Sequence, residues 1–149
     1  MRSVFVITLV LAFSVVFAEA QDTWASGCEE NEARLDGIVA KWSPQPGITS
    51  GEPGITKTLI IIAHPGSGEY SRNIMRHRLH NAREYLLYRK PAERKNIIVA
   101  EGEKRVGLGS VAFYLDGEVI DELFVKKNKS LCVDCCENNL IPPYKKWPR

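Results

Sequence analysis

The chain has 149 residues, 44% of them hydrophobic, and a formal net charge of +2 at pH 7. This length suits one globular domain with a hydrophobic core. The nearly balanced charge, without a basic tail or a low-complexity arm, gives no reason to predict nucleic acid as a partner.

Residues 1–20 have the pattern of a secretory signal peptide. Arg2 precedes an apolar run over residues 4–18, and the small residues of Ala18-Glu19-Ala20 suit signal peptidase. The run is too short for a membrane span. We therefore expect a secreted or periplasmic chain of 149 − 20 = 129 residues without a transmembrane segment. A lipoprotein signal ending at Cys28 is the alternative.

The mature chain predicts helices, strands and turns in a clear order. Apolar residues at helical spacing indicate the two helices, and runs of β-branched residues indicate the first two strands. Apolar and polar residues alternate on either side of the Asp116-Gly117 turn, which indicates a hairpin. A run rich in proline and glycine separates the first helix from the first strand. The predicted elements are a helix at 29–42, the turn-rich connection at 43–56, a strand at 57–64, a helix at 70–89, a strand at 95–102 and a hairpin at 110–125.

The strands at 57–64 and 95–102 are continuous apolar runs, so we expect both to be buried on both faces. The helix between them predicts a right-handed crossover that makes the two strands parallel. The expected fold is an α/β (α+β) two-layer sandwich formed by residues 21–131, followed by a cysteine-containing, proline-rich tail at 132–149.

Four cysteines are present in a chain that we expect to meet oxidising conditions. A bond between the adjacent Cys135 and Cys136 would strain their peptide, so the sequence favours pairing Cys28 with one of Cys132, Cys135 and Cys136. A Cys28–Cys132 bridge would close a loop of 132 − 28 = 104 residues and stabilise the fold by roughly 4–5 kcal/mol. A zinc site built from these cysteines is the alternative.

The segment HPGSGE at residues 64–69 lies between a strand and a helix, where backbone amides attract anions. It lacks the lysine of a P-loop and has two of the three glycines of a dinucleotide fingerprint, so a tight turn explains it better. We expect His64, His77 and His80 to be solvated surface histidines. The alternative is that the three form a metal site. No catalytic motif appears, so we predict no enzyme and no cofactor.

Arg78 lies at the edge of the apolar stripe of the second predicted helix. A guanidinium there can hold a ligand carboxylate by two hydrogen bonds. The alternative is an internal ion pair with Glu69 or Asp36.

The segments IIAH, EYSRNIMRHRLHNAREYL and ERKNIIVAEGE resemble the OmpA-like peptidoglycan-binding domain, from about residue 33 to residue 125. Ala63-His64 corresponds to the family's Gly-His, Arg78 to its arginine, and residues 96–103 to the second strand. The resemblance implies a β-α-β-α-β fold and a non-catalytic domain in which an aspartate and the arginine bind the diaminopimelate of the cell-wall stem peptide.

The chain departs from the family pattern at several positions. Gly66 stands where the family has its aspartate, Ser71 replaces an asparagine, and the loop is shorter by three residues. No clear strand precedes the first helix. Losing the aspartate that pairs with the ligand's ammonium group costs about 1.5–3 kcal/mol of binding free energy.

We therefore weigh three hypotheses. The first is an exported, non-catalytic binding module in which Arg78, His64, Glu69 and Ser71 recognise a carboxylate-bearing ligand, with the peptidoglycan stem peptide or an envelope protein as partner. The second is a disulfide-stabilised structural or protein-interaction domain that has lost the family ligand site. The third is an enzyme or metal-dependent protein that uses the three histidines.

Overall fold

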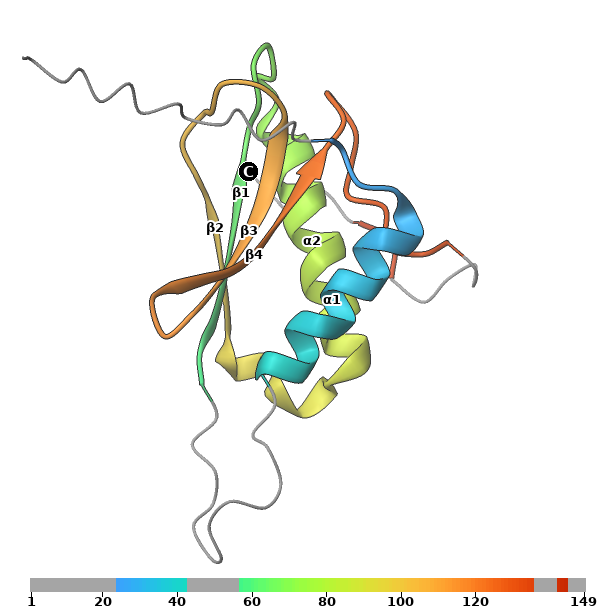
Figure 1. The fold of residues 1–149 in the computed structure, drawn as a ribbon, viewed down its shortest axis with the longest axis vertical. Coiled ribbons are helices and arrows are strands. Elements are labelled where there is room, and N and C mark those ends of the chain that lie inside the picture. Colours follow the sequence, from blue (N-terminus) through green and yellow to red (C-terminus); the bar gives the residue numbers. More distant parts are fainter. Residues whose placement is uncertain (1–23, 43–56, 136–141, 145–149) are drawn as a thin grey trace, which may run out of the picture.

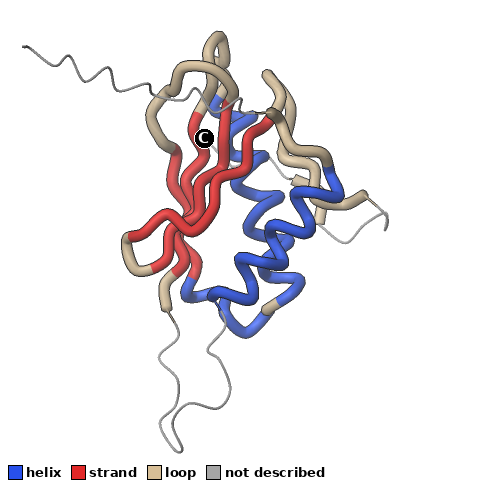
Figure 2. The backbone as a smooth tube through the Cα atoms, in the orientation of Figure 1, coloured by secondary structure: helices blue, strands red, loops and turns tan. Residues whose placement is uncertain are grey.

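A computed structural model describes residues 24–42, 57–135 and 142–144 (Figure 1). Two helices pack side by side on one face of a four-stranded sheet, as Figures 1 and 2 show. This confirms the predicted two-layer α/β sandwich. The elements are α1 (Cys28–Trp42), β1 (Leu59–His64), α2 (Arg72–Arg89), the short 3-10 helix η1 (Pro91–Asn96), β2 (Ile97–Glu101), β3 (Gly109–Leu115) and β4 (Glu118–Val125).

The apolar faces of both helices form the core against the sheet. Helix α1 buries Leu35, Ile38 and Trp42, and acidic residues in its first turn suit the helix dipole. Helix α2 buries the predicted stripe, which consists of Met75, Leu79, Ala82 and Leu86. Helix α2 ends at Arg89 because the next residue, Lys90, precedes Pro91, and a residue before proline disfavours the helical conformation.

The strands are arranged in the order β2-β1-β3-β4. Strands β1 and β2 are parallel, with Leu59 opposite Ile97, which confirms the prediction from the helical crossover. Strand β3 is antiparallel to both β1 and β4. Among the described residues no strand precedes α1.

The turn between β3 and β4 is the predicted two-residue hairpin. Asp116 and Gly117 have φ values of 54° and 86°, and the type I′ turn requires positive φ at both central positions. This local signal therefore predicts the turn and the pairing next to it, Leu115 with Glu118, whereas the register shifts between Phe113 and Tyr114.

Our expectation that β1 and β2 are buried on both faces is wrong. Both helices cover the same face of the sheet (Figure 2). On the other face Ile60 and Ile62 are half-buried, and Ile98 on the edge strand β2 is 52% exposed. A run of β-branched residues favours strand whether one face or two are covered, so the sequence pattern does not reveal that the described helices cover one face.

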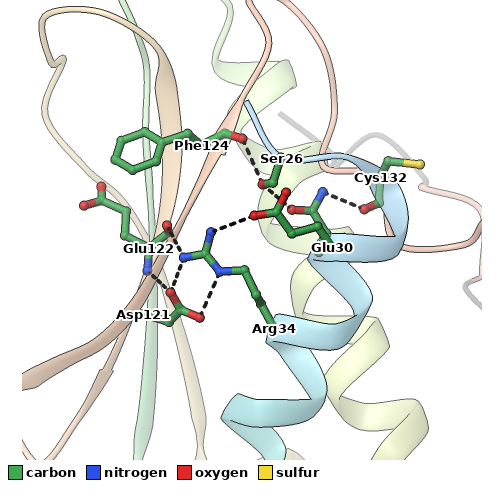
Figure 3. A network of polar contacts seen from close by, with 8 residues as sticks. Ser26, Glu30, Arg34, Asp121, Glu122, Phe124 and Cys132 are labelled. Carbon is green, nitrogen blue, oxygen red and sulfur yellow. Dashed lines mark hydrogen bonds and ion pairs between the residues drawn. The ribbon is translucent and has the colours of Figure 1, made fainter. Parts of the chain in front are cut away.

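Polar contacts attach α1 to strand β4 (Figure 3). The guanidinium of Arg34 hydrogen-bonds both carboxylate oxygens of Asp121 and, at 2.9 Å, the carbonyl oxygen of Glu122. Glu30 lies one helical turn before Arg34 and forms a longer ion pair with it at 3.8 Å. These contacts fix how α1 lies across the sheet.

The segment after β4 returns to the core through Leu131 and Val133, which are 0% and 2% exposed. No helix in the part of the chain that the structure describes is long and apolar enough to cross a membrane. The predicted signal peptide at 1–20, the connection at 43–56 and most of the predicted tail at 132–149, including Cys136, lie outside the described residues.

Candidate functional site

The candidate site lies where β1 ends and α2 begins, around Arg78, which the OmpA-like resemblance matches to the family's arginine. Glu69 and Arg78 form an ion pair there, and both side chains are 0% exposed. The Arg78 Nη1 donates to Oε2 of Glu69 at 2.8 Å, and Nη2 donates to Oε1 at 2.6 Å. This is the bidentate geometry that makes an arginine–carboxylate pair strong.

Backbone groups complete the coordination of both charges. Arg78 also donates to the carbonyl oxygens of Lys129, at 2.9 Å, and Lys126, at 3.3 Å. Glu69 accepts hydrogen bonds from the amides of Gly66, at 2.8 Å, and Asn128, at 2.6 Å. The pair therefore joins three segments, namely the turn after β1, helix α2 and the turn after β4.

These contacts set the ionisation of Glu69. Burial alone would raise the pKa of its carboxyl, but hydrogen bonds from Arg78 and from the amides of Gly66 and Asn128 lower the pKa from 4.5 to about 2. Glu69 is therefore a carboxylate at neutral pH, as a partner for Arg78 must be.

Two glycines let the backbone approach this pair. A Cβ atom at Gly66 would lie 2.4 Å from the Gly109 nitrogen and 2.6 Å from the Gly107 oxygen. A Cβ atom at Gly109 would lie 2.3 Å from Nη1 of Arg78 and 2.5 Å from Oε2 of Glu69. No side chain fits at either position without moving backbone or the buried pair.

The loops that follow β1 and β2 are bonded to each other above the pair, at the top of Figure 1. The Ser67 amide donates to the Gly107 oxygen at 2.8 Å, and the Gly107 amide donates to the Ser67 hydroxyl at 3.0 Å. The amides of Gly102 and Arg105 donate to the oxygens of residues 63 and 65 at 2.8 and 2.9 Å. The two loops thus form one ordered surface.

His64, at the end of β1, is 9% exposed and belongs to a second polar cluster. Its Nδ1 lies 3.0 Å from the Glu103 carbonyl oxygen, and its Nε2 lies 3.1 Å from Nη2 of Arg105. The Arg105 guanidinium also pairs with Glu122, whose Oε1 accepts a hydrogen bond from the Ser110 hydroxyl at 2.6 Å. Because Arg105 can only donate, the Nε2 of His64 accepts and its Nδ1 carries the proton.

Ser71 is exposed and precedes the first residue of α2, but its side chain forms no capping hydrogen bond. Beside it, Tyr70 is 84% exposed with the Lys104 ammonium 4.3 Å from its ring centroid. Val106, in the neighbouring loop, is 98% exposed. An aromatic residue and an aliphatic residue are thus presented to solvent on the ordered loop surface.

The three histidines do not come together. His77 and His80 contact Tyr144, with ring centroids 4.8 and 5.4 Å apart, whereas His64 lies in the cluster with Arg105. Burial, and to a lesser degree the nearby His80, lower the pKa of His77. Among the described residues the one group of three or more potential metal ligands is Cys28, Cys132 and Cys135.

As the sequence predicts, Cys28 lies close to the cysteines of the C-terminal group. Cys28 is at disulfide distance from Cys132, 104 residues away, and also from Cys135. This arrangement is consistent with a disulfide between the start of α1 and the segment after β4.

Comparison with protein-family models, curated proteins and solved structures finds no match for this chain.

Of the predicted ligand-binding residues, Glu69 and Arg78 bond to each other, whereas His64 bonds to Glu103 and Arg105 and Ser71 is exposed. The sequence left Asp36 open as the partner of Arg78, but Asp36 instead pairs with Arg89 and Tyr85. The sequence did not single out Tyr70, Val106 and Arg105 as part of a loop surface. The run of charged and small residues at 101–109 is the signal that could have indicated an exposed loop there.

Proposed function

We propose that this chain is an exported, non-catalytic protein-interaction domain, stabilised by a disulfide, whose buried Glu69–Arg78 pair supports a binding surface on the loops after β1 and β2. The observation that carries this proposal is that Arg78 is fully buried and already holds the chain's own carboxylate. This favours the second of our three hypotheses over recognition of a ligand carboxylate by Arg78.

The energetics of the pair support this choice. The Arg78 guanidinium donates four hydrogen bonds, two to the Glu69 carboxylate and two to backbone carbonyl oxygens. A ligand carboxylate would have to replace Glu69 and leave that buried carboxylate without its cation. Breaking a buried pair in this way costs about 3–5 kcal/mol, which would consume much of the affinity of a small peptide.

The loop surface has features that suit a protein partner. Tyr70 and Val106 are exposed on backbone already ordered by hydrogen bonds, so binding them costs little conformational entropy. Tyrosine is enriched at the centres of protein interfaces, where its ring is buried and its hydroxyl stays bonded. Lys104 over the ring and Lys127 against Gly68 make an acidic protein surface the complementary partner.

As part of this proposal, we take the chain to be a distant relative of the OmpA-like domain. From α1 to β4 the chain follows the helix, strand, helix, strand order that the resemblance implies, and Arg78 lies on the predicted helix. In this proposal Gly66 and Glu69 together replace the family's ligand-facing aspartate by an internal carboxylate. The compartment implied by the resemblance and by residues 1–20 is the periplasm or the exterior.

Site-specific photo-crosslinking in the intact host tests the proposal. A photoreactive amino acid replaces Tyr70 or Val106, and Val119 serves as the matched control because it is 57% exposed at the opposite, hairpin end of the sheet. We expect one discrete protein adduct from positions 70 and 106 and none from position 119. Adducts of equal yield from all three positions, or none from any, would contradict the proposed surface.

A further inference from the structure

The two edges of the sheet differ in how their backbone groups are bonded. Strand β4 forms one edge and β2 forms the other. Along β4, three alternate carbonyl oxygens accept hydrogen bonds from α1 and from the segment before it, two of which are drawn in Figure 3. These bonds run from the Lys41 ammonium to Ile120 at 3.1 Å, from the Arg34 guanidinium to Glu122 at 2.9 Å and from the Ser26 amide to Phe124 at 3.2 Å. The chain itself therefore covers the β4 edge.

The backbone of β2 shows which of its groups point away from the sheet. Just after this strand, the Gly102 amide donates to the Ala63 oxygen of β1 at 2.8 Å. Successive residues of a strand direct their backbone groups to opposite sides, so those of Ile98 and Ala100 also point toward β1. The amide and carbonyl of Val99 therefore point outward, as do the Ile97 carbonyl and the Glu101 amide. Within the described residues no hydrogen bond reaches these outward groups.

Strand β2 also lacks the devices that keep an edge strand from pairing. Its five residues, IIVAE, include no proline and no lysine, and its pairing with β1 runs without a register shift. Ile98 is 52% exposed on the face that the described helices leave uncovered. An apolar edge with unbonded outward groups is a template for a further strand.

We propose that β2 is a dimerisation edge, which pairs in the antiparallel direction with β2 of a second copy of this chain. In this arrangement Val99 lies opposite Val99 of the second copy, and Ile97 lies opposite Glu101. This register brings outward-pointing residues face to face along the whole strand, as antiparallel hydrogen bonding requires. The two Val99 residues exchange N–H···O bonds, and each Glu101 amide donates to an Ile97 carbonyl. A two-fold axis beside Val99 relates the two copies and closes the assembly.

The apolar side chains of β2 suit this self-pairing on both faces of the sheet. On the uncovered face, the exposed Ile98 of each copy lies opposite the small Ala100 of the other, so a large side chain packs beside a small one. On the helix-covered face, Leu79, Val99 and Glu101 line a cavity of about 190 Å³. Val99 of the second copy comes to lie next to this cavity. Pairing thus buries apolar surface that one copy leaves to solvent.

The charges at the two ends of β2 favour an antiparallel second copy. Exposed Arg94 and Lys95 precede the strand, and exposed Glu103 follows it. The proposed register places Lys95 of each copy beside Glu103 of the other, so unlike charges meet at both ends. The next basic residues are engaged elsewhere, since Lys104 lies over the Tyr70 ring and Arg105 pairs with Glu122.

The dimer goes beyond the proposed binding function and does not depend on it. Because the two β2 strands are antiparallel, the loops after β1 and β2 point toward opposite ends of the joined sheet in the two copies. Each copy therefore keeps its loop surface free, and the dimer presents two of them.

Sedimentation velocity of the oxidised protein, from micromolar to millimolar concentration, tests for the second copy. We expect a monomer–dimer equilibrium. Ile98→Lys should weaken dimerisation by about tenfold or more, because it places a charge at the apolar centre of the interface. Val119→Lys is the matched control, since Val119 is also apolar and 57% exposed but lies on β4. A protein that stays monomeric at millimolar concentration, or a dimer that Ile98→Lys leaves unchanged, would overturn the proposal.

Amide hydrogen exchange tests which backbone groups form the interface. In dilute protein the outward amides of Val99 and Glu101 should exchange faster than those of Ile98 and Ala100, which point toward β1. At concentrations that populate the dimer, the Val99 and Glu101 amides should become protected. Protection of these two amides at every concentration would show that another part of the chain covers the edge, and would overturn the proposal.

A charge exchange tests the antiparallel direction. Lys95→Glu should weaken the dimer by about two- to tenfold, because it places two carboxylates beside each other at both ends of the interface. The double variant Lys95→Glu/Glu103→Lys should restore the affinity, since unlike charges then face each other again. Equal weakening by the single and the double variant would overturn the proposed register.

Discussion

Glu69 and Arg78, nine residues apart, face each other in the interior with both carboxylate oxygens bonded to the guanidinium. Glu69 ends the turn after β1, and Arg78 lies two helical turns into α2. A bidentate carboxylate is the ligand that the OmpA-like resemblance led us to expect for this arginine. Here the chain itself supplies one, and the turns after β1 and β4 are attached to it through the amides of Gly66 and Asn128.

Removing one charge of the buried pair should destabilise the fold strongly. We expect Arg78→Ala or Glu69→Ala to lower the free energy of unfolding by about 3–5 kcal/mol, since each leaves an uncompensated buried charge. The double variant Glu69→Leu/Arg78→Met should lose less than the two single losses combined. Urea denaturation of the oxidised protein measures all three. Single losses below about 1 kcal/mol would show that water reaches the pair.

Stability should depend on pH through Glu69. The pKa of its carboxyl is lowered in the folded state to about 2 from 4.5, so the unfolded chain takes up the proton first as the pH falls. The contribution of Glu69 to stability is therefore complete above pH 4.5 and is lost as the pH falls toward 2. Thermal denaturation at several pH values should show that the stability of Glu69→Gln falls less steeply between these pH limits than the stability of the unmodified protein. Identical pH profiles for both proteins would contradict the assignment.

Replacing Gly66 by any residue with a side chain should destabilise the fold. Gly66→Ala should lower the free energy of unfolding by about 2 kcal/mol or more, because the added Cβ would overlap backbone atoms of the loop at 107–109. Gly66→Asp, which would place the family's aspartate at this position, should be worse and should not create a binding site. Gly37→Ala is the control: its Cβ meets no atom within 4 Å, and it should stabilise α1 by about 0.5–1 kcal/mol.

The contact between α1 and β4 should contribute less than the buried pair. Arg34→Ala should cost about 1 kcal/mol, because the Arg34 and Asp121 side chains are 32% and 20% exposed and Asp121 can be solvated after the change. Lys57→Ala, which breaks the more exposed pair with Asp116, should cost less than about 0.5 kcal/mol. Chemical denaturation compares the two variants, and the opposite order would contradict this ranking.

The sequence predicted those parts of the fold that depend on neighbouring residues. The stripe on α2, the proline that follows it and the Asp116-Gly117 turn are local signals, and each element lies within a few residues of its predicted range. The parallel pairing of β1 with β2 followed from the helix that connects them.

These local signals do not predict contacts between residues that are distant in the sequence. Either Glu69 or Asp36 could satisfy Arg78 in the sequence, and the choice depends on the tertiary position of α1, where Asp36 meets Arg89. Ile98 is exposed because both described helices pack on the other face of the sheet, and a β-branched run does not encode which face is covered. Likewise, two cysteines near Cys28 became evident only when the segment after β4 was placed on α1.

The side-chain Nε–H resonance of Arg78 gives the most direct test of the central claim. This proton is donated to the Lys129 carbonyl inside the protein. NMR should follow it in the oxidised protein during titration with a soluble diaminopimelate-containing muropeptide. If Glu69 permanently occupies Arg78, the resonance exchanges slowly with water and stays unchanged at millimolar muropeptide. A saturable shift of this resonance would show that the arginine receives the ligand carboxylate, and would contradict the account.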